Sequence, residues 1–208
     1  MSSVGLYRRY VLPRVIDLAM RDKAAAARRA ALIPQAAGVV LEVGIGSGLN
    51  LPFYTSAVGR LHGVDPSPEL LAMARRKIAL VPFPVELECQ SAEQLRVDSG
   101  SIDTVVTTWT LCSIPNPVEA LREMQRVLRP GGRLLFVEHG RSPDPGVRAW
   151  QRRLNPLWRR VAGGCHLDRK IDELIRSAGL GIDRLEMSYL PGPRLMTYTY
   201  EGSARAGR

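Results

Sequence analysis

The sequence predicts an α/β fold, in which an open, mainly parallel β-sheet carries helices on both faces. Three observations lead to this prediction. The apolar run Val39–Val43 leads directly into a glycine-rich loop and a helix start, as in a nucleotide-binding βαβ unit. Apolar strand-like runs and amphipathic helical segments then alternate as far as residue 140. Near the end, the short turn at 190–193 requires the last two predicted strands to be antiparallel.

The first strand and its loop form the most informative stretch of the chain. Three glycines follow the strand at alternate positions: Gly44, Gly46 and Gly48. A glycine has no Cβ, so the backbone there can take a positive φ and approach a ligand closely. We expect a helix to begin at Asn50 and to lie over 49–56, with its free N–H groups facing the loop.

The second strand is predicted over 61–64, and it ends in an acid. This residue, Asp65, comes nineteen residues after Gly46. In nucleotide-binding βαβ units, an acid at this place accepts hydrogen bonds from the ribose hydroxyls. Asp65 and the adjoining Pro66 are therefore candidate cofactor-binding residues.

The kind of cofactor depends on Glu42. The dinucleotide fingerprint is G-x-G-x-x-G, whereas this loop reads G-x-G-x-G and has Glu42 two residues before its first glycine. A pyrophosphate disfavours a nearby carboxylate, whereas an ammonium or sulfonium group tolerates or attracts one. The spacing thus favours a cofactor with a positive group, while the loop alone leaves open a dinucleotide or a turn with no ligand.

The next elements are predicted from capping residues and apolar periodicity. Ser67 is a good N-cap with Pro68 at the first helical position, so a helix begins there. Further strands are predicted over 85–90, 101–108 and 133–138, and a further helix over 117–128. Because the carboxyl ends of parallel strands form the ligand crevice, residues 109–114 should line the site.

Residues at these strand ends complete the predicted cofactor site. Ala92 would leave room for an adenine ring, and Glu93 or a backbone group would bind the amino group of that ring. Thr108 and Trp109 stand where the fourth strand enters the crevice, so they join the candidate cofactor-binding residues.

Two segments outside the central part are predicted to cover the site. Residues 1–37 form a helical lid in which Tyr7–Ala31 is helical with a break near Pro13. Such a basic amphipathic helix either packs over the domain or lies on anionic lipid. Residues 141–170 form a substrate cover that contains an interrupted helix over 147–161.

The C-terminal part completes one domain, 1–208. A helix over 169–178 should end at Gly179, because glycine is a common helix stop. Strands are predicted over 180–187 and 194–200, and the last six residues should be frayed.

The net charge of +9 is concentrated in the two covering segments. Residues 1–37 carry +5 and residues 141–170 carry +6, whereas 38–140 carry −2. Either an anionic surface or substrate meets these segments, or their arginines form a solvated face. Aromatic side chains do not interleave with the basic ones as an RNA-stacking surface requires, which disfavours nucleic acid as a partner.

Composition indicates the compartment. Three widely spaced cysteines argue against a disulfide framework and fit a reducing environment. The sequence shows no secretory signal and no apolar run near the ~20 residues that a membrane span needs. We expect a cytoplasmic protein that could associate peripherally with a membrane, and the oligomeric state is left open.

Five features in order resemble a class I S-adenosylmethionine (SAM)-dependent methyltransferase of the broad type 11 group. They are the glycine loop, the Asp65 acid, Ser91-Ala-Glu, the strand that contains Asp103, and Leu-Arg-Pro-Gly-Gly132. The resemblance implies a Rossmann-like seven-stranded sheet of order 3-2-1-4-5-7-6, with strand seven antiparallel. It also implies SAM as the cofactor and a small-molecule methyl acceptor.

A narrower likeness extends over most of the chain. Thr108–Ile114, Phe136–Gly140 and Trp150–Arg169 resemble the bacterial relatives of the methyltransferase-like thiol S-methyltransferases. The eukaryotic members of that group attach to membranes through a hydrophobic N-terminus, where this sequence has only a basic amphipathic stretch. The likeness implies a thiol as the acceptor.

A thiol acceptor must lose its proton, which a nearby imidazole can favour. His139, at the crevice end of the fifth predicted strand, is the first candidate base, and His166 in the cover is the second. Each could instead be a structural histidine. No metal site is predicted, because Cys165 and His166 supply two ligands without a spaced second pair.

The sequence therefore predicts a SAM-dependent methyltransferase that acts on a small molecule, with a thiol as the implied acceptor. Two alternatives stay open. One is a phospholipid or quinol methyltransferase at a membrane surface. The other is a non-enzymatic binder of an anionic surface or of nucleic acid.

Overall fold

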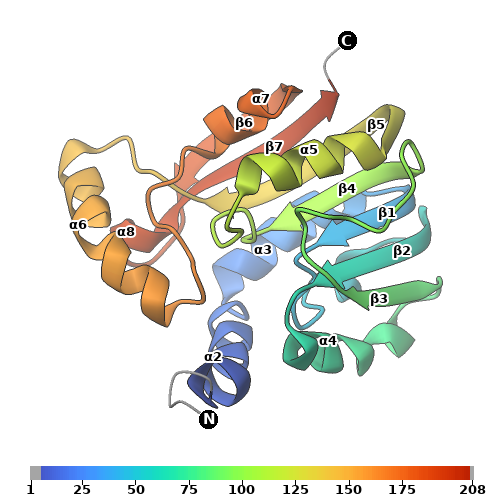
Figure 1. Cartoon of the computed structure of the whole chain (residues 1–208), viewed down its shortest axis with the longest axis horizontal. Helices are drawn as coiled ribbons and strands as arrows, with labels where there is room; N and C mark the ends of the chain where they lie inside the picture. The colour runs from blue at the N-terminus through green and yellow to red at the C-terminus, as the bar shows by residue number, and fades with distance from the viewer. Residues whose placement is uncertain (1–5, 207–208) are drawn as a thin grey trace.

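The computed structural model describes residues 6–206 and contains a seven-stranded sheet (Figure 1). Its strand order is β3-β2-β1-β4-β5-β7-β6. Strands β1 to β5 pair in parallel, whereas β7 is antiparallel to both of its neighbours, β5 and β6. The predicted fold class, the strand order and the antiparallel seventh strand are thus confirmed.

The elements follow the predicted alternation of strand and helix. The strands are Gly38–Val43 (β1), Val58–Asp65 (β2), Val85–Cys89 (β3), Ile102–Thr108 (β4), Leu128–His139 (β5), Leu180–Tyr189 (β6) and Tyr198–Ala206 (β7). The α-helices are Leu12–Ala19 (α2), Lys23–Leu32 (α3), Pro68–Arg75 (α4), Pro117–Val127 (α5), Pro145–Val161 (α6), Ile171–Ser177 (α7) and Arg194–Thr197 (α8). A π-helical turn at Tyr7–Val11 precedes α2.

Two apolar cores lie on opposite faces of the sheet, because successive strand residues point to opposite sides. Leu134 and Phe136 of β5 pack in one core with α5 and α7. Leu135 and Val137 pack in the other core with residues that include Leu32 of α3. The central strands are therefore buried on both faces, as their near-continuous apolar runs predict.

Helix starts follow local capping chemistry. The Ser67 hydroxyl accepts a hydrogen bond from the Leu70 N–H at 3.2 Å, which confirms the predicted cap of α4. Asp22 caps α3 in the same way. The N-terminal segment breaks at 20–22, between α2 and α3. The break predicted near Pro13 is wrong, because residues 6–19 stay helical and change only from π to α geometry at Leu12.

Two sequence predictions in the loops are wrong. In place of a helix over 49–56, a single 3₁₀ turn spans Leu51–Phe53. The backbone becomes extended at Tyr54, and the Tyr54 hydroxyl donates a hydrogen bond to Glu42. This tertiary contact ends the 3₁₀ turn. The helix predicted as interrupted near 147–161 is continuous through Pro156. Most of α6 faces solvent, where water can satisfy the carbonyl that proline leaves free.

The C-terminal predictions also need correction. Residues 194–197 form α8, and β7 begins only at Tyr198. Of the six residues expected to be frayed, Ser203 to Ala206 pair in β7, and 207–208 lie outside the described residues. The end of β7 pairs with β5, as Arg205 does with Arg133, and with β6, as Ala206 does with Leu180. β5 begins at Leu128, before the predicted 133.

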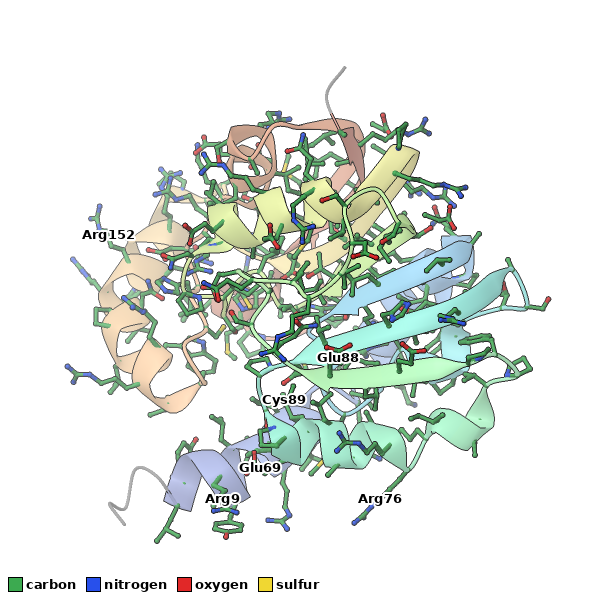
Figure 2. The ribbon with its side chains drawn as sticks, turned by 45° about the vertical axis from the view of Figure 1, so that its right-hand side comes forward. Arg9, Glu69, Arg76, Glu88, Cys89 and Arg152 are labelled. Carbon is green, nitrogen blue, oxygen red and sulfur yellow. The ribbon has the colours of Figure 1, made fainter. Side chains whose placement is uncertain are left out.

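Helices α2 and α6 lie beyond the carboxyl ends of the parallel strands (Figure 1). Gln151 of α6 is buried, and its amide bonds Gly140 O at 3.1 Å and Leu195 O at 3.0 Å. On the outer side of the same helix, Arg152 projects away from the protein (Figure 2). The two predicted covering segments are thus folded as helices at the edge where parallel strands form a ligand crevice.

Candidate functional site

A cavity of about 860 Å³ lies at the carboxyl ends of the parallel strands. Its lining combines the loop after β1, the ends of β2 and β4, helix α2 and the segment after α6. Its volume is within the usual range for small-molecule sites. Most of the predicted cofactor-binding residues line it: Glu42, Gly44, Gly46, Asn50, Asp65, Pro66, Ala92, Glu93, Thr108 and Trp109.

The three loop glycines have positive φ and different surroundings. A Cβ on Gly44 would collide with Thr110 at 2.2 Å, and one on Gly48 would lie 2.9 Å from Leu51. These two glycines permit close packing, and Gly48 does not line the cavity. A Cβ on Gly46 would meet only the Gly44 carbonyl oxygen, at 3.9 Å. The face of the loop at Gly46 is therefore open to a ligand.

Asp65 ends β2 beside this open face. Its Oδ2 accepts a hydrogen bond from the Gly46 N–H at 3.0 Å, and its Oδ1 accepts one from the Ser67 N–H at 2.8 Å. Burial raises the pKa of Asp65, and these two N–H groups oppose that shift. Each carboxylate oxygen keeps a free lone pair, so the group could accept hydrogen bonds from ligand hydroxyls.

Glu42 is the most deeply buried acid of the cavity, at 1% exposed. Its oxygens accept hydrogen bonds from Asn50 Nδ2 at 2.8 Å and the Tyr54 hydroxyl at 2.7 Å. Burial raises the pKa of Glu42 to about 7, although these donors and the charge of Arg29 oppose the shift. Asn50 also donates to Thr108 Oγ1 at 3.0 Å, which joins the loop to the end of β4.

Arg29 is a site residue that the sequence did not reveal. It is 4% exposed, its Nε donates to Asn50 Oδ1 at 2.9 Å, and its guanidinium carbon lies 4.8 Å from the Trp109 ring centroid. The sequence carries no signal that separates it from the adjacent Arg28, which instead pairs with Glu201. Only the packing of α3 against the loop distinguishes the two.

Trp109 has the one positive φ, 50°, of any non-glycine residue described. Such a conformation is uncommon for a bulky side chain and marks a site that the surrounding structure constrains. Its N–H donates to Val137 O at 2.8 Å, and its ring lies beneath Arg29. The turn after β4 is therefore held from two sides at the cavity wall.

Ala92 and Glu93 line the cavity beyond the end of β3. Ala92 is buried, which leaves the volume that a larger side chain would fill. Glu93 Oε1 accepts a hydrogen bond from the Asn116 N–H at 3.0 Å, and its Oε2 pairs with the Ser91 hydroxyl. The carboxylate is thus already oriented by two partners on the protein.

Helix α2 is tied directly to the glycine loop. The Ser47 hydroxyl donates to Asp17 Oδ1 at 2.5 Å, and Lys77 donates to Ser47 O at 2.7 Å. Burial raises the pKa of Asp17, but its bonds to Ser47 and Arg21 lower it by more. The apolar residues that the sequence assigns to one face of this helix line the cavity: Val15, Ile16, Ala19 and Met20.

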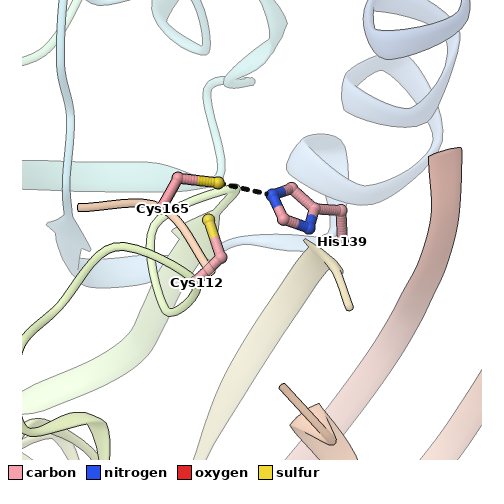
Figure 3. Close-up of side chains that lie close together, drawn as sticks. All are labelled: Cys112, His139 and Cys165. Atoms are coloured by element: carbon pink, nitrogen blue, oxygen red, sulfur yellow. Dashed lines mark hydrogen bonds between the residues drawn. The ribbon is translucent and has the colours of Figure 1, made fainter. Parts of the chain in front are cut away.

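The cavity wall also holds a cluster of sulfur and imidazole, shown in Figure 3. His139 Nε2 lies 2.9 Å from Cys165 Sγ, and the possible ligand atoms of these two residues and Cys112 lie within 4.8 Å of one another. His139 Nδ1 is buried and has no hydrogen-bond partner among residues 6–206. Sequence reasoning missed this grouping, because it compared Cys165 only with its neighbour His166.

Charge and burial affect the two histidines differently. Burial lowers the pKa of His139, but its bond to Cys165 and the nearby Glu138 raise it by more. Burial and the charges of Arg169 and Arg159 lower the pKa of His166 to about 4. The structure places His139 in the cavity wall, whereas His166 does not line the cavity. The backbone N–H of His166 donates to Cys112 O at 2.8 Å.

Comparisons with known proteins agree with this geometry. A family profile described as a methyltransferase domain matches residues 41–136. Thiol S-methyltransferase TMT1B of Rattus norvegicus is 34% identical over 168 residues, which cover 76% of this chain and 68% of the rat protein. Phosphatidylethanolamine N-methyltransferase of Cereibacter sphaeroides is 40% identical over 114 residues, which cover 54% of this chain and 56% of that protein.

Solved structures agree in fold. A SAM-dependent methyltransferase from Methanosarcina mazei aligns with a TM-score of 0.65 at 20% identity, over 82% of this chain and 93% of the other. With the sequence relatives, this establishes that the chain belongs to the SAM-dependent methyltransferase family that includes the thiol S-methyltransferases. The predicted enzyme class and the SAM cofactor are confirmed.

The buried carboxyl of Glu42 generates a prediction about stability and pH. Its pKa is about 7 in the folded chain against 4.5 when unperturbed, so the protonated form favours folding. The protonated carboxyl makes its full contribution to the free energy of unfolding below pH ~4.5. That contribution is lost as the pH rises through ~7, and the total loss is about 3 kcal/mol at most. Glu42→Gln should remove that pH dependence from the free energy of unfolding, measured with urea across this range.

Glu88→Gln is the matched control, because Glu88 is exposed on β3 (Figure 2). It should leave the pH dependence of the wild type intact. If the wild type and Glu42→Gln show parallel curves of stability against pH, the proposed protonation of Glu42 is wrong.

Proposed function

We propose that this SAM-dependent methyltransferase methylates the sulfur of a small apolar thiol at a membrane surface. The observation that carries the thiol acceptor is the unpartnered, buried Nδ1 of His139 in the cavity wall. The similarity to thiol S-methyltransferases over most of the chain supports the same acceptor. SAM supplies an electrophilic methyl group on a sulfonium. This chain must therefore bind SAM and the acceptor, align the two and deprotonate the acceptor thiol.

We assign the cofactor to the part of the cavity bounded by the glycine loop. The open face at Gly46 would admit the cofactor close to the backbone, and Asp65 has lone pairs free for the ribose hydroxyls. Ala92 leaves space for the adenine, and Glu93 is oriented to accept from its amino group. The positive end of the cofactor would favour the ionised form of the nearby Glu42 carboxyl, because an opposite charge lowers the pKa of an acid.

The acceptor would enter at the other end, beside His139. With Nε2 bonded to Cys165, Nδ1 is the nitrogen left to take the thiol proton. The raised pKa of His139 makes it a stronger base than an ordinary imidazole. His166, the second predicted base, is neutral near pH 7 with a pKa of about 4, and it lies outside the cavity lining. We therefore keep the catalytic role for His139.

A membrane surface is supported by an exposed apolar stripe on α6. Its members recur at helical spacing on one face: Trp150, Leu154, Leu157 and Val161, between 37% and 62% exposed. Exposed arginines flank the stripe: Arg148, Arg152, Arg153, Arg159 and Arg160. A helix with this composition suits the interface of an anionic bilayer.

The N-terminal helices extend the same surface. The Tyr7 hydroxyl donates to Val161 O at 2.8 Å, which holds this segment against the end of α6. The segment adds further exposed apolar side chains: Leu6, Tyr10, Val11, Val15 and Leu18. None of the helices within residues 6–206 is long and apolar enough to cross a bilayer. Val161 and Val15 also line the cavity, so an apolar acceptor dissolved in lipid would have a short path to the site.

The cofactor assignment is tested with Asp65→Asn. The variant keeps one acceptor oxygen for the loop but loses the charge that strengthens hydrogen bonds to the ribose. We expect SAM affinity, measured by calorimetry, to fall by about 10- to 100-fold. Asp98→Asn, an exposed acid outside the cavity, should bind SAM like the wild type. Unchanged affinity in Asp65→Asn would refute the ribose placement.

The acceptor assignment is tested by transfer of labelled methyl from SAM to thiols, quinols, phenols and phosphatidylethanolamine, with chelator present. Transfer to a thiol is expected. His139→Gln should lower kcat/KM for the thiol by about 100-fold near neutral pH. The loss should shrink at high pH, where the free thiol ionises by itself.

His62→Gln is the control for this experiment, because His62 lies on β2 outside the cavity lining. A pH-independent loss in His139→Gln would indicate a structural role. Transfer only to the lipid or the quinol would replace the thiol with that acceptor.

The membrane surface is tested by sedimentation with vesicles. We expect the protein to bind phosphatidylglycerol-containing vesicles and to bind pure phosphatidylcholine vesicles more weakly. Leu157→Ser should weaken the binding by about tenfold, because it removes a side chain that would be buried in the interface. Leu80→Ser is the matched control, because Leu80 is 65% exposed and is distant in sequence from α6. Equal loss in both variants would contradict the assigned surface.

A further inference from the structure

The Cys112–His139–Cys165 cluster has the composition of a metal site. The atoms that could bind a cation lie within 4.8 Å of one another. In a tetrahedral zinc site, ligand bonds of ~2.0–2.3 Å place the ligand atoms about 3.5–3.8 Å apart. Small side-chain rotations would therefore bring these three groups onto one cation. Thiolate and imidazole are the ligands that soft and borderline cations prefer.

We propose that Cys112, His139 and Cys165 form a three-ligand site for a soft divalent cation such as Zn²⁺, with its fourth position open to the cavity. All three residues line the cavity, so a cation held among them would lie at its wall. Three protein ligands with one open position are the pattern of catalytic rather than structural zinc.

The backbone around the cluster holds the three ligands in place. They come from the turn after β4, the end of β5 and the segment after α6. The bond from the His166 N–H to Cys112 O ties the first of these segments to the third. Trp158 Nε1 donates to Cys165 Sγ at 3.3 Å, a contact of the kind that orients metal-bound sulfur.

Charge balance also favours a cation. Two thiolates and one divalent cation are neutral together, so the loaded site buries no net charge. A thiol binds a divalent cation as the thiolate. A divalent cation would displace both protons to solvent. The nearby Arg169 donates to backbone carbonyls, including Ile114 O at 2.7 Å. Its guanidinium is therefore already engaged with other groups than the two thiols.

The consequence for catalysis rests on the proposed function. A thiol that takes the open position would lose its proton to solvent and stay bound as a thiolate. With Nε2 on the cation, His139 Nδ1 carries a hydrogen and no longer accepts the proton. The cation then replaces His139 as the group that keeps the acceptor ionised.

The site is tested by titrating the reduced, chelator-treated full chain with Co²⁺, and with Zn²⁺ in competition. We expect one Co²⁺ per chain, with the charge-transfer absorption of a cobalt–thiolate bond. Cys112→Ser and Cys165→Ser should each lose about half of that absorption, because one thiolate remains, and at least ~100-fold in affinity. His139→Gln should keep the absorption and bind more weakly.

Cys89→Ser is the matched control, because Cys89 is exposed at the end of β3 and outside the cavity (Figure 2). It should bind Co²⁺ like the wild type. Calorimetric SAM binding by each variant shows that the fold is retained. If the wild type binds Co²⁺ no more tightly than a Cys112→Ser, Cys165→Ser double variant, the site is refuted.

The thiol transfer assay separates this inference from the proposed function. One equivalent of Zn²⁺ should raise kcat/KM for the thiol at neutral pH in the wild type by about tenfold, and not in Cys112→Ser. Thiol methylation without any metal binding would overturn the site and leave the proposed function standing. Stoichiometric metal binding without thiol methylation would support the site and refute the thiol acceptor.

Discussion

The buried carboxyl of Glu42 is the constraint on which the arrangement of the site depends. A polar group removed from water must find hydrogen-bond partners, or it costs the protein several kcal/mol. Glu42 finds them in Asn50 and Tyr54, and Asn50 in turn bonds Arg29 and Thr108. The end of β1, the loop behind it, α3 and the end of β4 are thereby joined in one network. A cavity wall built this way is rigid before any ligand arrives.

The cavity that this network supports has two chemically different ends. The end at the glycine loop offers backbone and carboxylate groups for a polar cofactor, with Asp65 as the principal acid. The part around His139 offers two thiols, one imidazole and Trp158. Methyl transfer needs both ends in line, because the reaction is a direct displacement whose rate depends on alignment. The strand ends supply that alignment through the rigid sheet.

Helix α6, in the covering segment, is held in place mainly by side-chain hydrogen bonds, whereas the sheet is held by its buried apolar cores. In α6, Gln151 bonds two backbone carbonyls, and Asn155 bonds Asp168 at 2.7 Å, while the apolar stripe remains in solvent. Polar anchors of this kind position a helix without burying its apolar face. The exposed stripe beside the cavity mouth is thus compatible with a folded, stable domain, and an interface with lipid would bury what folding leaves open.

Sequence reasoning located the parts of the fold and site that depend on local chemistry. The apolar run of β1, the alternate glycines, Asp65 and the Ser67 cap are each encoded within a few residues, and the structure has each of them. Several of its errors share one cause, which is a contact from outside the local segment. The Tyr54–Glu42 bond ended a predicted helix, and pairing of β7 with β5 and β6 ordered the predicted frayed end. Arg29 was missed for the same reason.

The sequence by itself determined the fold class, the place of the glycine loop and the family, because periodicity, turn residues and motif spacing are local properties of the chain. Only the tertiary structure decided which side chains share the part of the cavity wall around His139. Cys165 and His139 are 26 residues apart, and their Sγ and Nε2 atoms lie 2.9 Å from each other, while the adjacent His166 does not line the cavity. Which of two neighbouring residues faces a site depends on how whole elements pack, and that packing is the sum of contacts between segments far apart in the chain.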